Sequence, residues 1–163
     1  MEERLVDWKG GKLVRTLILG LGNPILGDDA VGVLAARQLA ARLQGRPGVE
    51  VDEDYHGGLR LMERLAGYDR AILIDAICTG VHPPGTLLRL GPDEMPTQHT
   101  ASAHDVNLPT ALRLAAAMGL GAPQDIAIFA VEAENVLEFD EQCTPAVAAA
   151  LPRVVEAVLA ELA

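Results

Sequence analysis

The sequence predicts a three-layer α/β/α sandwich built on a mostly parallel, five-stranded twisted sheet. Short apolar runs alternate with stretches of helical periodicity along most of the chain, a pattern typical of a parallel sheet covered by helices on both faces. The chain has 163 residues, which is the usual length of one domain. We therefore expect a single α/β domain over residues 1–163, in which residues 1–12 form a polar N-terminal extension with Gly10 and Gly11 as a loose joint.

The first strand and the turn after it organise the rest of the chain. Val14–Leu19 is an apolar run bounded by turn formers, which is typical of a buried strand. Gly20–Pro24 ends this strand, because glycine adopts backbone angles closed to other residues and proline has no amide to donate. A helix is expected over residues 28–43. The turn therefore lies at the carboxyl end of a strand, where open α/β sheets bind their ligands.

The glycine turn does not match a dinucleotide-binding fingerprint. That motif, G-x-G-x-x-G, needs a glycine at position 25, which is Ile25 in this chain. Asp28 and Asp29 also bring two carboxylates to the helix start, where a pyrophosphate would need free amides. Phosphate binding at this turn is therefore not expected.

The remaining elements continue the alternation of strands and helices. Residues 49–54 begin with alternating apolar and acidic positions, which predicts a short second strand. Residues 91–103 have no apolar periodicity and are expected to form a long loop, and long loops in compact domains are usually functional or mobile. The other predicted strands cover residues 70–77, 86–90 (an edge strand) and 125–131, and the other predicted helices cover residues 59–67, 105–118 and 144–162.

Charge and composition exclude several classes of protein. The net charge of −10 argues against binding to nucleic acid, because too few basic residues are present to neutralise phosphates. A partner, if charged, is expected to carry a basic patch. Cys78 and Cys143 lie far apart without a C-x-x-C spacing, so neither a zinc site nor a disulfide framework is predicted. No apolar stretch is long enough to span a membrane, and the N-terminal residues lack the apolar core of a signal peptide. We therefore expect a cytoplasmic protein.

Carboxylates and histidines occur where the predicted strands end. Because the carboxyl ends of parallel strands share one edge of the sheet, we expect these residues to converge there with a histidine from the long loop. Two carboxylates and an imidazole would suit a divalent metal that accepts oxygen and nitrogen ligands. The residues concerned are Asp28, Asp29, Glu53, Asp54, His56, Asp75 and His104.

Several of these residues also have a purely structural interpretation. Asp28 is a good helix N-cap, and a carboxylate in the first helical turn gains about 0.3–1 kcal/mol from the helix dipole, which explains one aspartate but not Asp29 as well. Asp75, at the end of a strand, is expected to bond loop amides. His104 could be a surface residue at a helix start, although that position favours a neutral imidazole able to bind metal.

Four motifs give the sequence a resemblance to a known family. Residues 20–32, G-L-G-N-P-I-L-G-D-D-A-V-G, are similar to the family pattern G-x-G-N-x-L-x-D-[DE]-x-x-G. Residues 74–76 (I-D-A), 102–108 (S-A-H-D-V-N-L) and 144–147 (T-P-A-V) are similar to its later motifs, in the same order. The chain thus resembles the hydrogenase maturation endopeptidases, which trim the C-terminal extension from the large subunit of nickel–iron hydrogenases.

The resemblance implies a ligand set for nickel that the substrate carries. In that family two carboxylates and one histidine are thought to bind the nickel already inserted in the precursor, and two of these ligands correspond to Asp29 and His104. The third lies in an Asp-Gly-Gly-Thr turn, from which this sequence departs with E-D-Y-H-G-G. Counting back without gaps from the next strand gives Glu53, whereas aligning the glycine pair gives His56. Glu53 is therefore the predicted ligand and His56 its rival.

The function implied is an endopeptidase that processes the precursor of the [NiFe] hydrogenase large subunit, with neither nucleic acid nor a membrane as a partner. Nickel would come with the substrate, and other divalent metals are expected to be able to occupy the site. Asp29, Glu53 and His104 would form the catalytic centre. Cleavage would be metal-dependent if the metal polarises the scissile carbonyl or a water, and aspartyl-type if a carboxylate such as Asp29 acts as general base.

Two other functions stay open at this point. A non-catalytic maturation factor that binds nickel or the hydrogenase would use the same residues without cutting the precursor. A nucleoside phosphorylase-like enzyme, suggested by fold analogy alone, would need a basic phosphate pocket where this sequence has carboxylates.

Overall fold

A five-stranded sheet with the order β4-β3-β5-β7-β6 forms the centre of the molecule. The computed structural model of the chain describes residues 7–55, 59–95 and 108–163. The four strands β3 (Thr16–Leu21), β4 (Val49–Asp54), β5 (Arg70–Ile77) and β7 (Asp125–Glu132) are parallel, and β6 (Leu87–Leu90) pairs antiparallel with β7 at one edge. The predicted mostly parallel, five-stranded sheet with an edge strand near residues 86–90 is confirmed.

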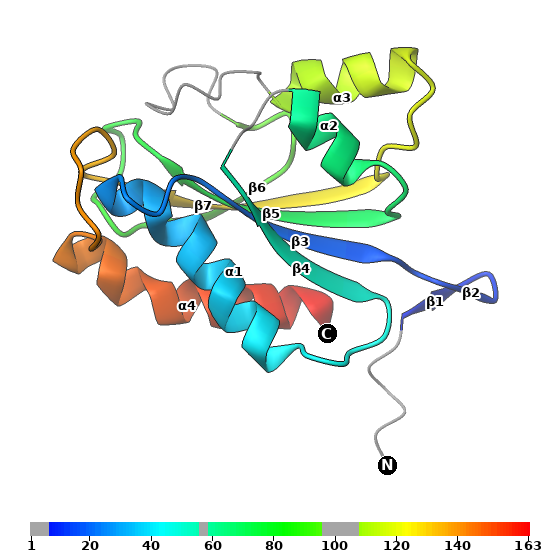
Figure 1. Cartoon of the computed structure of the whole chain (residues 1–163), viewed down its shortest axis with the longest axis horizontal. Coiled ribbons are helices and arrows are strands. Elements are labelled where there is room, and N and C mark those ends of the chain that lie inside the picture. Colours follow the sequence, from blue (N-terminus) through cyan, green and yellow to red (C-terminus); the bar gives the residue numbers. More distant parts are fainter. Residues whose placement is uncertain (1–6, 56–58, 96–107) are drawn as a thin grey trace.

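Helices cover both faces of this sheet, as Figure 1 shows. On one face lie α1 (Val31–Arg42) and α4 (Pro145–Leu162), and on the other lie α2 (Leu59–Leu65) and α3 (Leu108–Ala117). The predicted three-layer α/β/α architecture is therefore confirmed. Among the helices of the described ranges, none combines the length and the apolar character that crossing a membrane requires.

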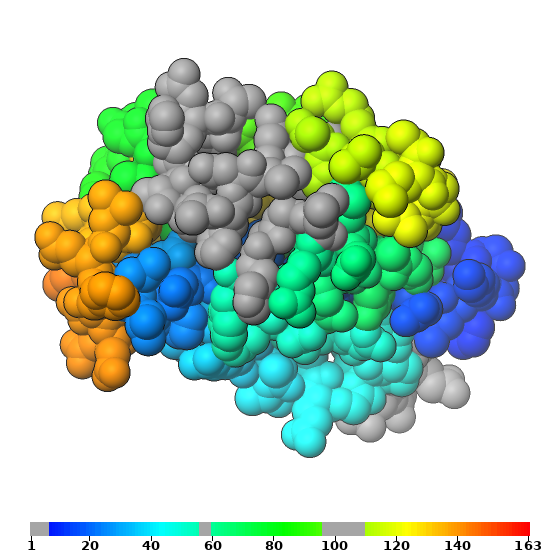
Figure 2. Space-filling model, turned by 45° about the horizontal axis from the view of Figure 1, so that its top comes forward, coloured from blue at the N-terminus to red at the C-terminus, as the bar shows by residue number. Residues whose placement is uncertain are grey.

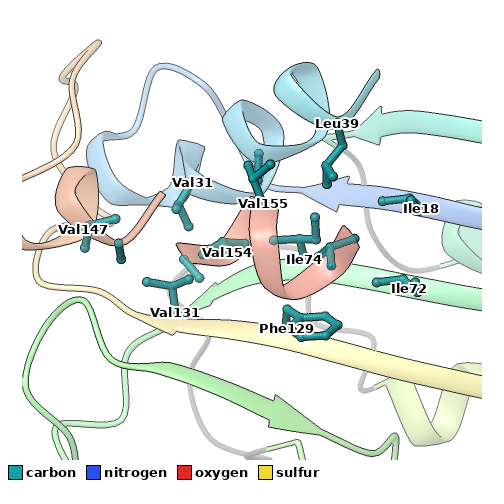
Figure 3. Close-up of a cluster of buried hydrophobic side chains, with 14 of the residues drawn as sticks. Ile18, Val31, Leu39, Ile72, Ile74, Phe129, Val131, Val147, Val154 and Val155 are labelled. Atoms are coloured by element: carbon teal, nitrogen blue, oxygen red, sulfur yellow. The ribbon is translucent and has the colours of Figure 1, made fainter. Parts of the chain in front are cut away.

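The larger core lies between the sheet and the pair α1 and α4 (Figure 3). Ile18 of β3 points to this face, whereas its neighbours Leu17 and Leu19 point to the opposite face and pack with α2. Successive residues of a strand face opposite sides of the sheet, so a strand with helices on both sides is apolar throughout. This explains the unbroken apolar run in the sequence. The labelled residues of the larger core are Ile18, Val31, Leu39, Ile72, Ile74, Phe129, Val131, Val147, Val154 and Val155.

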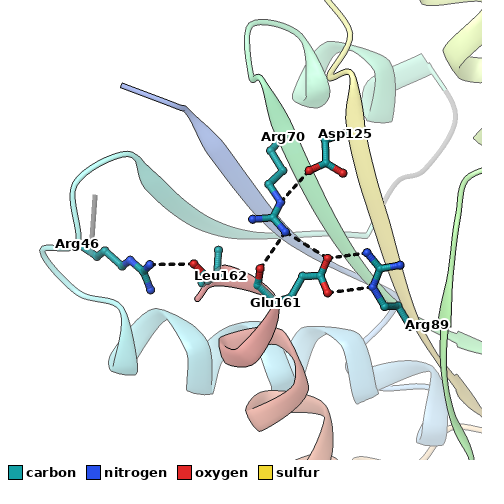
Figure 4. A network of polar contacts seen from close by, with 6 residues as sticks. All are labelled: Arg46, Arg70, Arg89, Asp125, Glu161 and Leu162. Carbon is teal, nitrogen blue, oxygen red and sulfur yellow. Dashed lines mark hydrogen bonds and ion pairs between the residues drawn. The ribbon is translucent and has the colours of Figure 1, made fainter. Parts of the chain in front are cut away.

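A network of ion pairs fastens the end of α4 to the amino edge of the sheet, where the parallel strands begin (Figure 4). Glu161 accepts two hydrogen bonds from Arg89 of β6, at 2.9 and 2.6 Å. Arg70, the first residue of β5, contacts the Glu161 carboxylate at 3.2 Å, the Glu161 carbonyl at 2.9 Å and Asp125 at 3.2 Å. The Arg46 guanidinium donates to the Leu162 carbonyl at 3.3 Å. Arg70 and Arg46 thus satisfy two carbonyls of the last turn of α4, which have no partner inside the helix.

Two local expectations are wrong. Residues 8–13 form a small antiparallel hairpin, β1 (Trp8–Lys9) and β2 (Lys12–Leu13), and the glycine pair between them makes a tight turn with φ of 58° and 78° in place of a loose joint. Helix α1 begins at Val31, three residues later than predicted, because Gly27–Ala30 forms a 3₁₀ turn first. A 3₁₀ turn is a common way to start an α-helix.

Candidate active site

The glycines of the first motif allow close packing at the carboxyl edge of the sheet. Gly22 has φ of +132°, and a Cβ atom there would lie 1.9 Å from the Asp29 carbonyl oxygen. A Cβ atom at Gly32 would lie 2.3 Å from the Ile74 carbonyl oxygen and 2.5 Å from that of Leu21. Only glycine fits at both places. The start of α1 therefore lies directly against the ends of β3 and β5, and this contact brings Asp29 to the edge.

Asp29 and Asp75 are neighbouring carboxylates at this edge. Asp29 is 3% exposed, and its Oδ2 atom accepts a hydrogen bond from the Asn23 amide at 2.8 Å. The pKa of Asp75 is raised well above its usual value, first because its carboxyl is buried and second because Asp29 lies nearby. The hydrogen bond that it accepts from the Ala76 amide lowers the pKa but does not cancel this shift. Two carboxylates this close resist being ionised together. A cation or a shared proton would relieve their repulsion.

Glu53 comes from β4, the strand on the other side of β3, where it lies opposite Gly20. The Arg37 guanidinium of α1 donates two hydrogen bonds to its carboxylate, both at 2.9 Å, and the Tyr55 hydroxyl donates a third. The bonds from Arg37 lower the pKa of Glu53, although partial burial opposes this. Glu53 is therefore ionised at neutral pH and oriented by α1.

The two predicted histidine ligands, His104 and His56, lie outside the described residues. Within the described ranges, no group of three His, Cys, Asp or Glu side chains is arranged to hold a metal ion. The structure thus brings Asp29 and Asp75 close together at the carboxyl edge, whereas Glu53 of β4 is bonded to Arg37 of α1. The predicted set of Asp29, Glu53 and His104 stays a prediction.

Asp28 does not cap the helix, which corrects the structural interpretation made from the sequence. No side-chain hydrogen bond caps either the 3₁₀ turn or α1. The Asp28 carboxylate is fully buried and holds the loop of residues 133–144, which we call the β7–α4 loop. It accepts bonds from the amides of Glu134 and Asn135 (both 2.9 Å) and Thr144 (2.7 Å), and from the Thr144 hydroxyl. The similarity of residues 144–147 to a family motif was the only sequence signal of this contact.

Glu132 is a second buried carboxylate that anchors a loop and that the sequence did not single out. It is 1% exposed, and it accepts hydrogen bonds from the Thr79 amide at 3.0 Å, the Thr79 hydroxyl and the His82 amide at 3.4 Å. Burial disfavours its charge, but these bonds outweigh burial and lower its pKa. The sequence led us to expect that Asp75 bonds loop amides. In the structure Asp28 and Glu132 have this role, whereas the Asp75 carboxylate accepts a hydrogen bond from the amide of Ala76, its neighbour in β5.

Cys143 is not suited to be a nucleophile. Burial raises the pKa of its thiol to about 11, and the nearby Asp28 and Asp140 add to the shift. Because the thiolate is the reactive form of cysteine, this thiol is inert at neutral pH.

Comparison with known proteins assigns this arrangement to a family. The family model described as "Hydrogenase maturation protease" matches residues 33–161. The chain is 32% identical over 151 residues to the hydrogenase 2 maturation protease of Escherichia coli (strain K12), covering 91% of each protein. The chain belongs to the hydrogenase maturation protease family. The resemblance seen in the sequence motifs is thereby confirmed.

Solved structures of this family agree with the chain in sequence and in fold. The hydrogenase maturating endopeptidase HybD from E. coli superposes with a TM-score of 0.79 at 31% identity, covering 91% of this chain and 92% of that one. The [NiFe] hydrogenase maturation protease HybD from Thermococcus kodakarensis superposes with a TM-score of 0.70 at 26% identity, covering 92% and 100%. This hydrogenase maturation protease is accordingly a hydrolase, as expected, which sets aside the non-catalytic and phosphorylase-like alternatives.

Proposed function

We propose that this protease removes the C-terminal extension of a nickel-loaded [NiFe] hydrogenase large-subunit precursor, and that Asp29, Glu53 and His104 recognise the nickel. The observation that carries the proposal is the pair of neighbouring carboxylates at the carboxyl edge: burial and the nearby Asp29 raise the pKa of Asp75. Glu53 lies near the end of β4, on the other side of β3. A metal brought by the substrate would relieve the repulsion between Asp29 and Asp75. Carboxylate oxygens and an imidazole nitrogen are suitable donors for a divalent first-row metal.

Glu53 differs from the other predicted ligands, because its carboxylate is already bonded to Arg37. With both oxygens bonded to Arg37, Glu53 has to exchange or share that contact in order to bind nickel. His56 is the rival ligand. The variants Glu53→Gln and His56→Ala distinguish the two. Only substitution of the true ligand should slow cleavage of nickel-loaded precursor while leaving the thermal stability of the protease unchanged.

Two routes of peptide hydrolysis fit these residues. Asp29 could take a proton from the attacking water as general base. Alternatively, the nickel carried by the substrate could polarise the scissile carbonyl. Asp29 has a role in both, either as base or as ligand. Asp29→Asn, which keeps the shape of the side chain but removes its charge, therefore tests the site whichever route applies.

The decisive experiment is a processing assay with nickel-loaded and nickel-free precursor, in which mass spectrometry detects the released C-terminal peptide. The wild-type protein should cut only the loaded precursor. Asp29→Asn and His104→Ala should each slow cleavage by at least about a hundredfold, with a circular dichroism spectrum like that of the wild type. Arg42→Gln is the control. Arg42 lies on α1, like Arg37, and forms an exposed ion pair with Glu156 of α4. Efficient cleavage of nickel-free precursor, or normal cleavage by both site variants, would refute the proposal.

A further inference from the structure

Three large apolar side chains are exposed beside the candidate active site. Leu137 and Phe139, in the β7–α4 loop, are 73% and 82% exposed, and Ile25, in the turn after β3, is 47% exposed. The two segments are joined, because the Asp140 amide donates to the Ile25 carbonyl at 3.0 Å and the Gly27 amide donates to the Asp140 carbonyl at 2.8 Å. We call Ile25, Leu137 and Phe139 the apolar patch. An exposed apolar group of this kind is typical of an interaction surface.

The exposure of the patch is a built feature of the loop. Val136 is 6% exposed and packs into the larger core, so the loop is anchored directly before Leu137. The buried Asp28 carboxylate fixes both ends of the loop through the amides of Glu134, Asn135 and Thr144. Anchored in this way, the loop holds Leu137 and Phe139 in solvent and does not bury them.

The charges around the patch indicate what kind of partner fits it. The side chains of four acidic residues of the loop are exposed to solvent: Glu134, Glu138, Asp140 and Glu141. An apolar centre with an acidic rim is complementary to an apolar segment flanked by Lys or Arg. The net charge of −10 of the whole chain favours the same partner.

The patch is continuous with the carboxylate edge. Ile25 lies between Asn23, whose amide donates to Asp29, and Asp28, which holds the loop. Figure 2 shows the orange surface of the loop and the start of α4 against the blue surface of the turn after β3. A partner seated on the patch would therefore have part of its chain next to Asp29.

We propose that the apolar patch docks the hydrogenase large-subunit precursor through an apolar segment of that protein flanked by basic residues. This inference rests on the proposed function, since it takes the precursor as the partner. It adds a recognition surface outside the carboxylate edge. Docking at the patch supplies binding energy from residues remote from the scissile bond and presents the chain end to Asp29.

The test measures binding separately from cleavage. All variants are made in an Asp29→Asn background, and the dissociation constant for the purified precursor of the same organism is measured by calorimetry. Leu137→Ser/Phe139→Ser should raise the Kd at least about tenfold, because central apolar contacts dominate most interfaces. The control is Trp8→Ser/Met118→Ser, which removes two side chains of 62% exposure, one from the hairpin and one from the residue after α3. It should leave the Kd unchanged. Both double variants should unfold at the wild-type temperature, since all four side chains are exposed.

Charge reversal tests the basic flanks. Glu134→Lys/Glu138→Lys should lower the association rate and weaken its dependence on salt, whereas Glu63→Lys on α2 should change neither. An unchanged Kd in Leu137→Ser/Phe139→Ser would refute docking at the patch. Docking at the patch would also be refuted if sedimentation shows a dimer that Leu137→Ser/Phe139→Ser abolishes while this variant still binds the precursor. The patch would then bind a second copy of the chain. Precursor that binds through the patch but is never cut by the protein with Asp29 intact would refute only the proposed function.

Discussion

The two edges of the sheet hold their carboxylates in different ways. At the amino edge, the guanidinium groups of Arg70 and Arg89 bind the carboxylates of Glu161 and Asp125. At the carboxyl edge, backbone amides and a hydroxyl donate hydrogen bonds to Asp28. Glu132 follows the second pattern. Arginine neutralises a carboxylate, but an amide donates a hydrogen bond without adding net charge. The amino edge is therefore balanced and serves to fasten α4. At the carboxyl edge the bonds to Asp28 and Glu132 add no positive charge, although Arg37 pairs with Glu53 there. Because fewer of its carboxylates are paired with arginine, the carboxyl edge favours cations and basic segments.

Asp28→Ala should have the largest effect on stability. It leaves four donors of the β7–α4 loop without their acceptor, and burying such donors unpaired is costly. We expect the free energy of unfolding in urea to fall by about 3 kcal/mol. Asp140→Ala is the control, because the exposed Asp140 side chain bonds only the Gln142 amide of its own loop, among the described residues. A loss of less than about 1 kcal/mol in Asp28→Ala would show that the amides find other partners.

Glu161→Gln should have a smaller effect that depends on salt. Glu161 and Arg70 are largely but not fully buried, with side-chain exposures of 17% and 16%, so the loss should lie between those of surface and buried pairs, at about 1–2 kcal/mol. Because the contact is between full charges, part of the difference should disappear in 1 M NaCl. The penalty of Asp28→Ala should persist in the same salt. Equal salt dependence of the two variants would contradict the contrast between the edges.

Asp75→Asn should be mildly stabilising, with a gain that grows with pH. The pKa of Asp75 is raised in the folded protein, so ionising it costs stability as the pH rises above its ordinary value of 3.8 towards the folded pKa. An amide removes this cost and keeps the shape of the side chain. The melting temperature should therefore exceed that of the wild type at pH 8, by more than at pH 4.5. Asp52→Asn, which breaks an exposed pair with Arg64, should show no such gain. A lower melting temperature in Asp75→Asn at both values of pH would refute the assignment.

The elements of the fold were predictable because their signals are local. The predicted second strand at residues 49–54 coincides with β4, since alternation of apolar and acidic residues fixes which side chains face α1. The role of Asp28 was not predictable in this way. Its partners Asn135 and Thr144 lie 107 and 116 residues away, whereas its preference for helix caps acts on adjacent residues. The same holds for the Arg37–Glu53 pair, which joins α1 to β4 only after the two have packed.

Helix α4 sets the distance between the two edges. It starts beside Asp28, through Thr144, and it ends in the arginine network at Glu161. Its 18 residues span about 27 Å at 1.5 Å per residue, which matches the length of about 26 Å of the eight-residue strand β7. Removing one helical turn, about 5.4 Å, would leave the helix too short to reach both attachments. The length of α4 is therefore constrained by its two ends, whereas its solvent-facing residues are not constrained in this way.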